Sequence, residues 1–370
     1  MMPLPLLLTP GPLTTANGTR QAMLRDWGSR ETDFIALTDS VRRRLTALAK
    51  AEESHVCIPL QGSGTFAVEA MLGTLVPRDG HVLVMVNGAY GRRMVEICRV
   101  IGREATAFET AEDQPPSPLE LDRILAGNPA VTHVAAVHCE TTAGILNPIE
   151  EIAAVVARHG RRLLIDSMSA FGALPVDARR MAFDGLAASA NKCLEGIPGA
   201  AFVLCRQEAL AECEGRSPSV SLDLHAQWRQ LQRDGQWRFT PPTHVLAALS
   251  HALDRLDAEG GPPARLDRYR LNCALLVDGM RHLGFRPILP KHLQAPIIVT
   301  FHHPAHPRYN FAAFAEGLRQ RGIVIYPGKL TTAESFRIGC IGAIGPAEIA
   351  QALTAVSETQ KALGFMEIRI

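Results

Sequence analysis

Apolar runs and helical patterns alternate along the chain as far as residue 205. Short runs of strand-forming residues stand at 56–60, 81–86, 133–138, 163–165, 186–190 and 201–205, and most are apolar throughout. Continuous apolarity of this kind is typical of strands buried on both faces of a mostly parallel sheet. The helices between them are expected to begin near Gly64, Gly88, Ser117 and Ile149. This order predicts an α/β fold with right-handed crossovers, whose functional loops lie along the carboxyl edge of the sheet.

A smaller α+β region is predicted towards the C-terminus. A loop that contains Trp237 precedes a helical pattern at 245–256, and residues 260–263 (Gly-Gly-Pro-Pro) have the composition of a linker. Beyond the linker we expect a long helix at 265–283, strands at 297–301, 323–325 and 336–339, and a last helix from Pro346. We therefore predict an N-terminal arm (1–15), a large domain (16–259) and a small C-terminal domain (260–370).

Composition narrows the class of partner. The chain has 370 residues, of which 47% are hydrophobic, and this is enough to bury a sizeable core in about two domains. Lys and Arg number 38 against 37 Asp and Glu, so no net field draws the molecule to nucleic acid or to an anionic membrane surface. No apolar stretch approaches the roughly 20 residues that cross a bilayer. The expected partners are small molecules.

The N-terminal sequence and the cysteines indicate a cytoplasmic protein. The first eight residues lack the basic region of a signal peptide, and prolines break their short apolar run. The eight cysteines are scattered without a C-x-x-C pair, which suits buried thiols in a reducing compartment better than a disulfide framework. The spacing of His302, His303 and His306 matches no zinc-binding pattern, so we expect a loop there and no metal site.

Two strand ends carry the residues that point most strongly to chemistry. Asp166 ends one apolar run, and Lys192 follows another, 26 residues later. Taken singly, such an Asp is more often a cap or turn residue, and such a Lys is more often a surface residue. Together they match what pyridoxal 5'-phosphate requires: a carboxylate that keeps the pyridine nitrogen protonated, and a lysine that forms the Schiff base and shuttles the proton.

Such a cofactor also needs an anion site for its phosphate. Ser63, Gly64 and Thr65 lie between a predicted strand and a predicted helix, where amides and hydroxyls suit a phosphate group, although ordinary turns use the same residues. Tyr90 follows the next strand and could lie over a flat cofactor ring, or merely pack in a turn. Thr141 could reach the phenolic oxygen of the cofactor, with strand-end capping as the alternative.

Arg337 lies among apolar neighbours in the predicted strand 336–339. A guanidinium matches a carboxylate with two parallel hydrogen bonds, so a buried Arg of this kind is a candidate for binding the carboxylate of a substrate. A structural salt bridge is an equally good reading of the same residue. The local sequence leaves both open.

Seven short motifs, in this order, resemble the class-V aminotransferase group of the aspartate-aminotransferase-like (fold type I) pyridoxal-phosphate enzymes. They are TPGPLTT at 9–15, LQGSG at 60–64, NGAYG at 87–91, HCETT at 138–142, SANKC at 189–193, WRFT at 237–240 and IYPGK at 325–329. The similarity runs from about residue 6 to about residue 363. Each motif is short, but together they are specific.

The resemblance implies a homodimer with its active sites at the interface. It also implies a role for each candidate residue: Lys192 binds the cofactor covalently, Asp166 meets the pyridine nitrogen, Ser63, Gly64 and Thr65 surround the phosphate, Arg337 binds the carboxylate, and Thr240 reaches the phosphate of the neighbouring subunit's cofactor. Members of the group are usually more acidic and aromatic at residues 27–33 and lack Arg30. This departure concerns the pocket for the amino donor.

The motifs are most similar to those members that move the amino group of 2-aminoethylphosphonate to pyruvate. The expected products are phosphonoacetaldehyde and L-alanine, formed in two half-reactions through pyridoxamine phosphate. An alanine– or serine–glyoxylate aminotransferase is the nearest alternative, because it would share the cofactor residues but use a donor with an α-carboxylate. A non-catalytic binding protein of the same fold is disfavoured because both Lys192 and Asp166 are present. A cysteine desulfurase is disfavoured because Cys340 has no long mobile loop to carry it.

Overall fold

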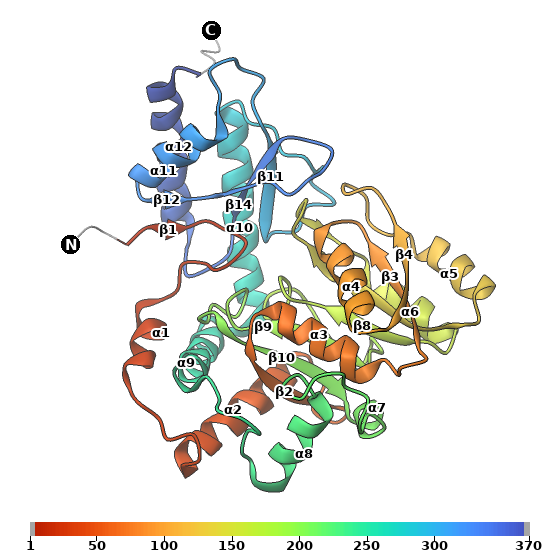
Figure 1. Cartoon of the computed structure of the whole chain (residues 1–370). Helices are drawn as coiled ribbons and strands as arrows, with labels where there is room; N and C mark the ends of the chain where they lie inside the picture. The colour runs from red at the N-terminus through yellow and green to blue at the C-terminus, as the bar shows by residue number, and fades with distance from the viewer. Residues whose placement is uncertain (1–3, 366–370) are drawn as a thin grey trace.

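The computed structural model describes residues 4–365, so the first three residues of the predicted arm and the last five of the predicted small domain lie outside it. Its central element is a seven-stranded sheet in the order β2-β10-β9-β8-β5-β3-β4 (Figure 1). These strands are β2 (His55–Gly62), β3 (His81–Val86), β4 (Glu104–Glu109), β5 (Val131–Val137), β8 (Arg162–Asp166), β9 (Gly185–Ser189) and β10 (Gly199–Arg206). β10 is antiparallel to both neighbours and the other pairs are parallel, which confirms a mostly parallel α/β sheet.

Helices cover both faces of this sheet (Figure 1). One face carries α2 (Thr32–Leu48), α5 (Pro118–Gly127), α6 (Ile149–Arg158) and α9 (Thr243–Glu259), and the other carries α3 (Gly64–Leu75), α4 (Ala89–Val100), α7 (Gln207–Ala211) and α8 (Leu224–Asp234). Along β3, Leu83 and Met85 face the first group, whereas Val82 and Val84 face the second. Because strand side chains alternate between faces, a sheet covered on both sides needs an apolar residue at every position.

A second, smaller core is built around a three-stranded antiparallel sheet, β11-β14-β13. Its elements are β11 (Ile298–His302), β13 (Tyr326–Pro327), β14 (Ser335–Gly339), α10 (Gly261–His282), α11 (Phe311–Gln320) and α12 (Pro346–Leu363). The centre of this core is aromatic: the ring of Phe336 lies 5.5 Å from those of Phe285 and Phe314 and 5.6 Å from that of Phe301. The predicted strands at 297–301 and 336–339 and the helix from Pro346 are confirmed.

The linker prediction for residues 260–263 is wrong. Gly260 ends α9 in a left-handed conformation, and α10 begins at once with Gly261. Pro262 and Pro263 stand in the first turn of α10, where a missing N–H has no cost and the fixed φ of proline suits a helix. The two helices are therefore joined directly.

The strand predicted at 323–325 is confirmed, and it lies outside the three-stranded sheet. β12 (Ile323–Val324) pairs in parallel with β1 (Leu6–Leu7) of the N-terminal arm and does not join the three-stranded sheet. The arm continues along the small core, where the N–H of Gly339 donates to the carbonyl of Leu8 at 2.9 Å. The chain then passes through α1 (Asn17–Gln21) and a 3₁₀ turn, Ala22–Leu24, to α2. Two further strands, β6 (Cys139–Glu140) and β7 (Ile145–Leu146), form a small ribbon.

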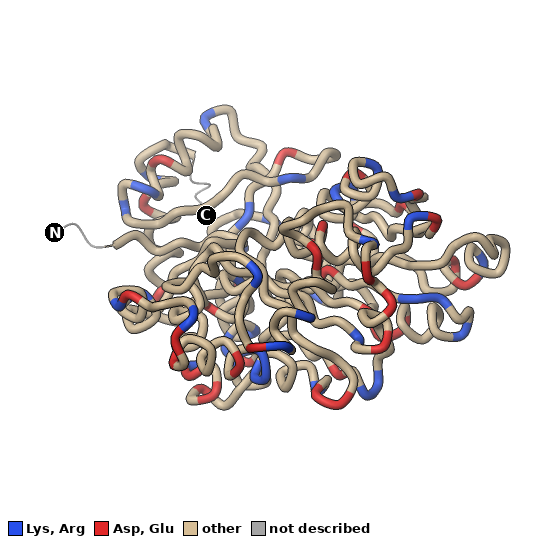
Figure 2. The backbone as a smooth tube through the Cα atoms, turned by 60° about the horizontal axis from the view of Figure 1, so that its bottom comes forward, with Lys and Arg blue, Asp and Glu red and all other residues tan. Residues whose placement is uncertain are grey.

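Charge and cysteines follow the sequence expectations. Acidic and basic residues alternate over the backbone without gathering into a large region of one sign in the view of Figure 2. All eight cysteines are free and buried, as predicted. Across residues 4–365, no helix combines the length and apolar character needed to cross a membrane.

Candidate active site

The carboxyl ends of the parallel strands meet around a cavity of about 500 Å³. The sheet order places β9, β8, β5 and β3 side by side, so the segments that follow them share one edge. Six residues predicted from the sequence line this cavity: Ser63, Gly64, Thr65, Tyr90, Asp166 and Lys192. A larger cavity of about 790 Å³, lined by Phe285 and His302 among others, contains none of the predicted site residues.

Asp166 is the last residue of β8 and is buried. Its Oδ1 accepts a hydrogen bond from the N–H of Met168 at 2.9 Å. Burial raises the pKa of this carboxyl from 3.8 to about 6, although the Met168 bond and the charges of Lys192 and Arg93 act in the opposite direction. A carboxylate in such a position interacts strongly with any cation that enters the cavity.

Lys192 lies just beyond the end of β9, and its amine points inward. Nζ donates to the carbonyl of Pro10 in the N-terminal arm. Gly11 packs so closely on the lysine that a Cβ there would come within 2.6 Å of Nζ. The alternative of a surface lysine is therefore wrong. Burial lowers the pKa of Lys192, which favours the neutral amine that a nucleophile requires.

The N-terminus of α3 faces the same cavity. Ser63 is the N-cap residue, and its side chain makes no capping bond, so its hydroxyl and the first amides of the helix suit an anion. A Cβ on residue 64 would meet the side chain of Met168, which would have to move to admit any larger residue. Arg93 on α4 donates to Thr65 Oγ1 at 3.3 Å and adds positive charge. Hydroxyls, amides and a guanidinium thus surround one end of the cavity.

One polar atom in the cavity wall lacks a partner. Ser189 is 3% exposed, and its Oγ has no hydrogen-bond partner among the described residues. Buried hydroxyls are nearly always hydrogen-bonded. The cavity is therefore suited to a ligand that brings a polar group to Ser189.

Tyr90 lies in the first turn of α4 between two cations. The guanidinium of Arg93 is 5.1 Å from the centre of its ring and the amine of Lys329 is 4.9 Å from it. Burial alone would raise the pKa of Tyr90, but a hydrogen bond with Thr141 and the charges of Lys192, Lys329 and Arg337 lower it overall.

Arg337 and Thr141 adjoin the cavity without lining it. Arg337 is buried on β14, and it donates to the carbonyl of Pro327 at 3.0 Å and to that of Thr141 at 3.1 Å. Within the described part of the chain its guanidinium bonds to backbone carbonyls and not to a carboxylate. The structural salt bridge offered as an alternative is thus not formed there. Burial lowers the pKa of Arg337.

Thr240 and Arg30 are the residues that the structure does not bring to this cavity. Thr240 is exposed in the loop before α9, and Arg30 is exposed in the turn before α2. Neither lines the cavity formed by a single chain.

Two residues that the sequence analysis missed belong to the site. Glu140 is fully buried and accepts hydrogen bonds from the N–H groups of Tyr90 and Gly91, at 3.2 and 3.4 Å, so its carboxylate caps α4 from a different strand. Burial raises the pKa of Glu140. Arg93 is the other, and its spacing of three from Tyr90 along a helix is a signal that could have found it.

Comparison with known proteins identifies the family of this chain. Residues 15–340 match the family model of the class-V aminotransferases, and the chain belongs to this family. It is 56% identical to the 2-aminoethylphosphonate–pyruvate transaminase of Pseudomonas entomophila (strain L48), over 98% of this chain and 99% of the relative. The protein of the same name from Pseudomonas aeruginosa (strain UCBPP-PA14) is 55% identical, over 98% of both chains.

Solved structures share the whole fold. Pyridoxamine–pyruvate aminotransferase from Mesorhizobium loti has a TM-score of 0.90 at 24% identity, covering 98% of this chain and 93% of that one. Alanine–glyoxylate aminotransferase from Nostoc sp. has a TM-score of 0.90 at 24% identity, covering 97% and 96%. The fold is that of the aspartate-aminotransferase-like, fold type I transferases, as the sequence predicted.

Proposed function

We propose that this aminotransferase moves the amino group of 2-aminoethylphosphonate to pyruvate, giving phosphonoacetaldehyde and L-alanine, as a step in phosphonate breakdown. The observation that carries the proposal is that Lys192 and Asp166 face one cavity beside the N-terminus of α3. The names of relatives that are 55–56% identical over 98% of the chain support the choice of substrates.

The residues around the cavity fit pyridoxal 5'-phosphate. Ser63, Gly64, Thr65, Arg93 and Ser189 would hold its phosphate, and the unpartnered hydroxyl of Ser189 would gain a bond there. Tyr90 would lie against the ring, Thr141 would bond its phenolic oxygen, Asp166 would hold the proton on its ring nitrogen, and Lys192 would bind it covalently. When bound, the cofactor supplies an electron sink that eases removal of a proton from the substrate carbon that bears nitrogen.

Lys192 and Asp166 then divide the proton handling between them. Because burial lowers the pKa of Lys192, its amine gives up a proton more readily than a solvent-exposed lysine does. The carboxylate of Asp166 would hold a proton on the ring nitrogen of the bound cofactor. The two groups would therefore act on different atoms, Lys192 on the substrate carbon and Asp166 on the ring nitrogen.

Two cations near Tyr90, Arg337 and Lys329, suit the two anionic substrates. Arg337 has the planar geometry that binds the carboxylate of pyruvate and alanine. The amine of Lys329 lies 3.5 Å from the hydroxyl of Tyr90 and is exposed, so it can turn to a phosphonate, which carries more charge than a carboxylate. We assign the carboxylate to Arg337 and the phosphonate to Lys329 together with Arg337.

The remaining assignments concern the whole protein. We propose a cytoplasmic homodimer in which Thr240 reaches the phosphate site of the partner subunit, because Thr240 is exposed and does not line the cavity of its own chain. We also keep the division into an arm (1–15), a large domain (16–259) and a small domain (260–370). The seven-stranded sheet lies wholly in the second part and the three-stranded sheet in the third.

One assay distinguishes the proposal from an alanine– or serine–glyoxylate aminotransferase. Purified protein is incubated with pyridoxal phosphate, pyruvate and either 2-aminoethylphosphonate or serine, and alanine is measured. Alanine formed with the phosphonate and not with serine is expected, and the reverse result would refute the substrate assignment. A colourless protein that makes no alanine with either donor would indicate a non-catalytic binding protein. The Lys192→Ala variant should lack the yellow colour of the covalently bound cofactor.

A further inference from the structure

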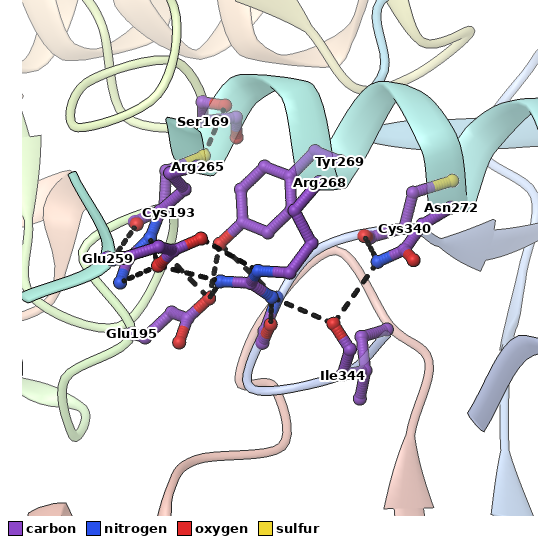
Figure 3. A network of polar contacts seen from close by, with 11 residues as sticks. Ser169, Cys193, Glu195, Glu259, Arg265, Arg268, Tyr269, Asn272, Cys340 and Ile344 are labelled. Carbon is purple, nitrogen blue, oxygen red and sulfur yellow. Dashed lines mark hydrogen bonds and ion pairs between the residues drawn. The ribbon is translucent and has the colours of Figure 1, made fainter. Parts of the chain in front are cut away.

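A largely buried group of charged and polar residues supports the turn that carries Lys192 (Figure 3). This charged cluster consists of Glu195, Glu259, Arg265, Arg268 and Tyr269. Glu195 follows Lys192 in the turn after β9, Glu259 ends α9, and the other three stand in the first turns of α10. The cluster therefore joins the large sheet to the helix that leads into the small core.

Glu195 is held in an unusual conformation next to Lys192. Its N–H donates to the carbonyl of Lys192 at 2.8 Å, and its φ is +60°, a region that residues other than glycine seldom adopt. Its Oε1 accepts hydrogen bonds from Arg268 and from the hydroxyl of Tyr269, both at 2.7 Å. These two contacts tie the shape of the turn to α10.

Arg265 holds the same turn through its backbone. This residue is fully buried, and its Nη1 donates to the carbonyl of Cys193 at 2.9 Å. Its other nitrogens bond to Glu259 at 2.8 and 3.0 Å. Cys193 and Glu195, which both follow Lys192 in the chain, are thus fixed by side chains from α10.

The other side of the cluster fixes the loop that follows β14. Arg268 donates to the carbonyls of Gly342 at 2.6 Å and Ile344 at 2.8 Å, and the hydroxyl of Tyr269 accepts from the N–H of Gly342 at 3.4 Å. This loop continues directly from β14, the strand that carries Arg337. One turn of α10 therefore contacts the segments that present both Lys192 and Arg337.

We propose that Glu195 is a positioning residue which, through Arg268 and Tyr269, fixes Lys192 relative to Arg337. The proposal rests on the assigned roles of Lys192 with the cofactor and Arg337 with the carboxylate. Three features of Glu195 oppose stability: its positive φ, its buried ion pair, and its Oε2, which has no hydrogen-bond partner among the described residues. The need to place Lys192 accurately explains why position 195 is a glutamate, because a small displacement of a reacting group lowers the reaction rate steeply.

Glu195→Gly separates placement from stability, because glycine adopts a φ of +60° without strain but has no carboxylate. Two rates are measured: the rise in absorbance when pyridoxal phosphate attaches to cofactor-free protein, and each half-reaction in single turnovers. Both should fall about ten- to a hundredfold. Glu195→Gln, which keeps the reach, should recover part of the loss. The matched control is Lys50→Gly. Among the described residues, Lys50 is the other non-glycine residue with a positive φ, and it is exposed just after the C-terminus of α2. The Lys50→Gly variant should have the same two rates as the wild type.

Tyr269→Phe covers the case in which Glu195→Gly does not fold, because it removes a single hydroxyl from the cluster. It should lower the same rates in the same direction by a smaller factor. The proposal would be overturned if Tyr269→Phe and every folded Glu195 variant attached pyridoxal phosphate and carried out both half-reactions at wild-type rates. This holds whatever the melting temperatures of the variants. The attachment rate tests Glu195 even if 2-aminoethylphosphonate is not a substrate. If borohydride reduction and peptide mapping placed the cofactor on another lysine, the proposal would fall together with the assigned site.

Discussion

At the scale of single residues, Asp166 combines a cost in stability with a role in chemistry. Burial raises the pKa of its carboxyl from 3.8 to about 6. Because the folded protein binds this proton more tightly than the unfolded chain, the cofactor-free protein loses stability as the pH rises from about 4 to about 6 and does not regain it above. The loss amounts to about 3 kcal/mol at neutral pH.

Asp166→Asn should therefore have opposite effects on stability and turnover. The cofactor-free variant should be about 2–3 kcal/mol more stable than the wild type at pH 8, with the difference shrinking towards pH 4, because an amide does not ionise. The variant loaded with cofactor should hardly turn over, since an amide cannot keep the ring nitrogen protonated. Urea unfolding at both pH values and single-turnover absorbance measure the two effects. Wild-type half-reaction rates would show that the assigned role is wrong.

Arg337→Ala should damage the half-reaction of pyruvate and alanine most, because those substrates carry the carboxylate. A charged hydrogen-bonded contact is worth roughly 1.5–3 kcal/mol, which corresponds to about ten- to a hundredfold in kcat/KM. Single-turnover absorbance changes with each substrate measure the effect. Unchanged amination of pyruvate by the pyridoxamine form would mean that Arg337 has a structural role only.

Lys329→Gln is the matched test on the phosphonate side. The glutamine keeps most of the side-chain length and removes the charge beside Tyr90, so the KM for 2-aminoethylphosphonate should rise about tenfold while the rates with alanine and pyruvate stay within about twofold of the wild type. An equal loss with both substrates would contradict the separate assignment of Lys329 and Arg337.

The sequence predicted those site residues whose position in the chain already encodes their place in the fold. Asp166 and Lys192 end buried apolar runs, and the carboxyl ends of parallel strands meet at one edge, so their proximity could be inferred. Glu140 could not be found in this way, because it caps α4 from 50 residues further along the chain. Lys329 reaches Tyr90 across 239 residues, and no local pattern indicates such a contact.

At the scale of elements, the N-terminal arm forms part of the active site and not a loose extension. β1 pairs with β12, the carbonyl of Pro10 accepts from Lys192, and Gly11 lies against the same side chain. The φ of Gly11 is +121°, which disfavours any side chain. Elements that are predicted one at a time do not show that the N-terminal arm reaches Lys192.

Gly11→Ala should disturb the site without unfolding the protein. A Cβ at this position would stand 2.6–2.9 Å from the Nζ, Cδ and Cε of Lys192, so the arm or the lysine must move. We expect about a tenfold slower attachment of pyridoxal phosphate. Gly102→Ala is the control, because Gly102 also has a positive φ but a Cβ there would meet nothing within 4 Å. Equal attachment rates in the two variants would show that the contact with Lys192 does not matter.

One element prediction failed, and the neighbour of one correctly predicted strand could not be inferred, for the same physical reason. The run 260–263 contains the residues of a linker, but prolines at the start of a helix and a glycine at the end of the preceding one also suit a direct junction. β12 has the apolar character of a core strand, and its sequence does not say that its neighbour is the arm. Local composition fixes the conformations that are permitted, whereas the partner is chosen by tertiary packing.

At the scale of the whole molecule, one sheet buried on both faces was predictable because the apolar runs have no polar side. The position of the small core relative to that sheet could not be predicted. It depends on contacts such as those of Arg268 with Glu195 and Gly342, which join three distant segments of the chain. Lys and Arg balance Asp and Glu over the entire chain, so single charges placed at the cavity, and not a global field, attract anionic substrates.

The proposed homodimer leads to a prediction that depends on two subunits. If the partner subunit's Thr240 completes each phosphate site, Thr240→Glu should disable the enzyme by repelling the phosphate, and Lys192→Ala should disable it by removing the nucleophile. A mixed dimer of the two variants would contain one intact site, so co-expression should restore about a quarter of the wild-type activity under random pairing. Sedimentation should show a dimer in every case.

A second mixture provides the control for this complementation. Lys192 and Asp166 line the same cavity of one chain. Co-expressed Lys192→Ala and Asp166→Asn subunits therefore leave both sites of a mixed dimer defective and should restore no activity. If this pair recovered activity as well, the two residues would act in different sites. If Thr240 serves the neighbouring subunit, one site of each mixed dimer of Lys192→Ala with Thr240→Glu holds every group that the mechanism requires. If these mixed dimers formed but recovered no activity, Thr240 would therefore not serve the neighbouring subunit.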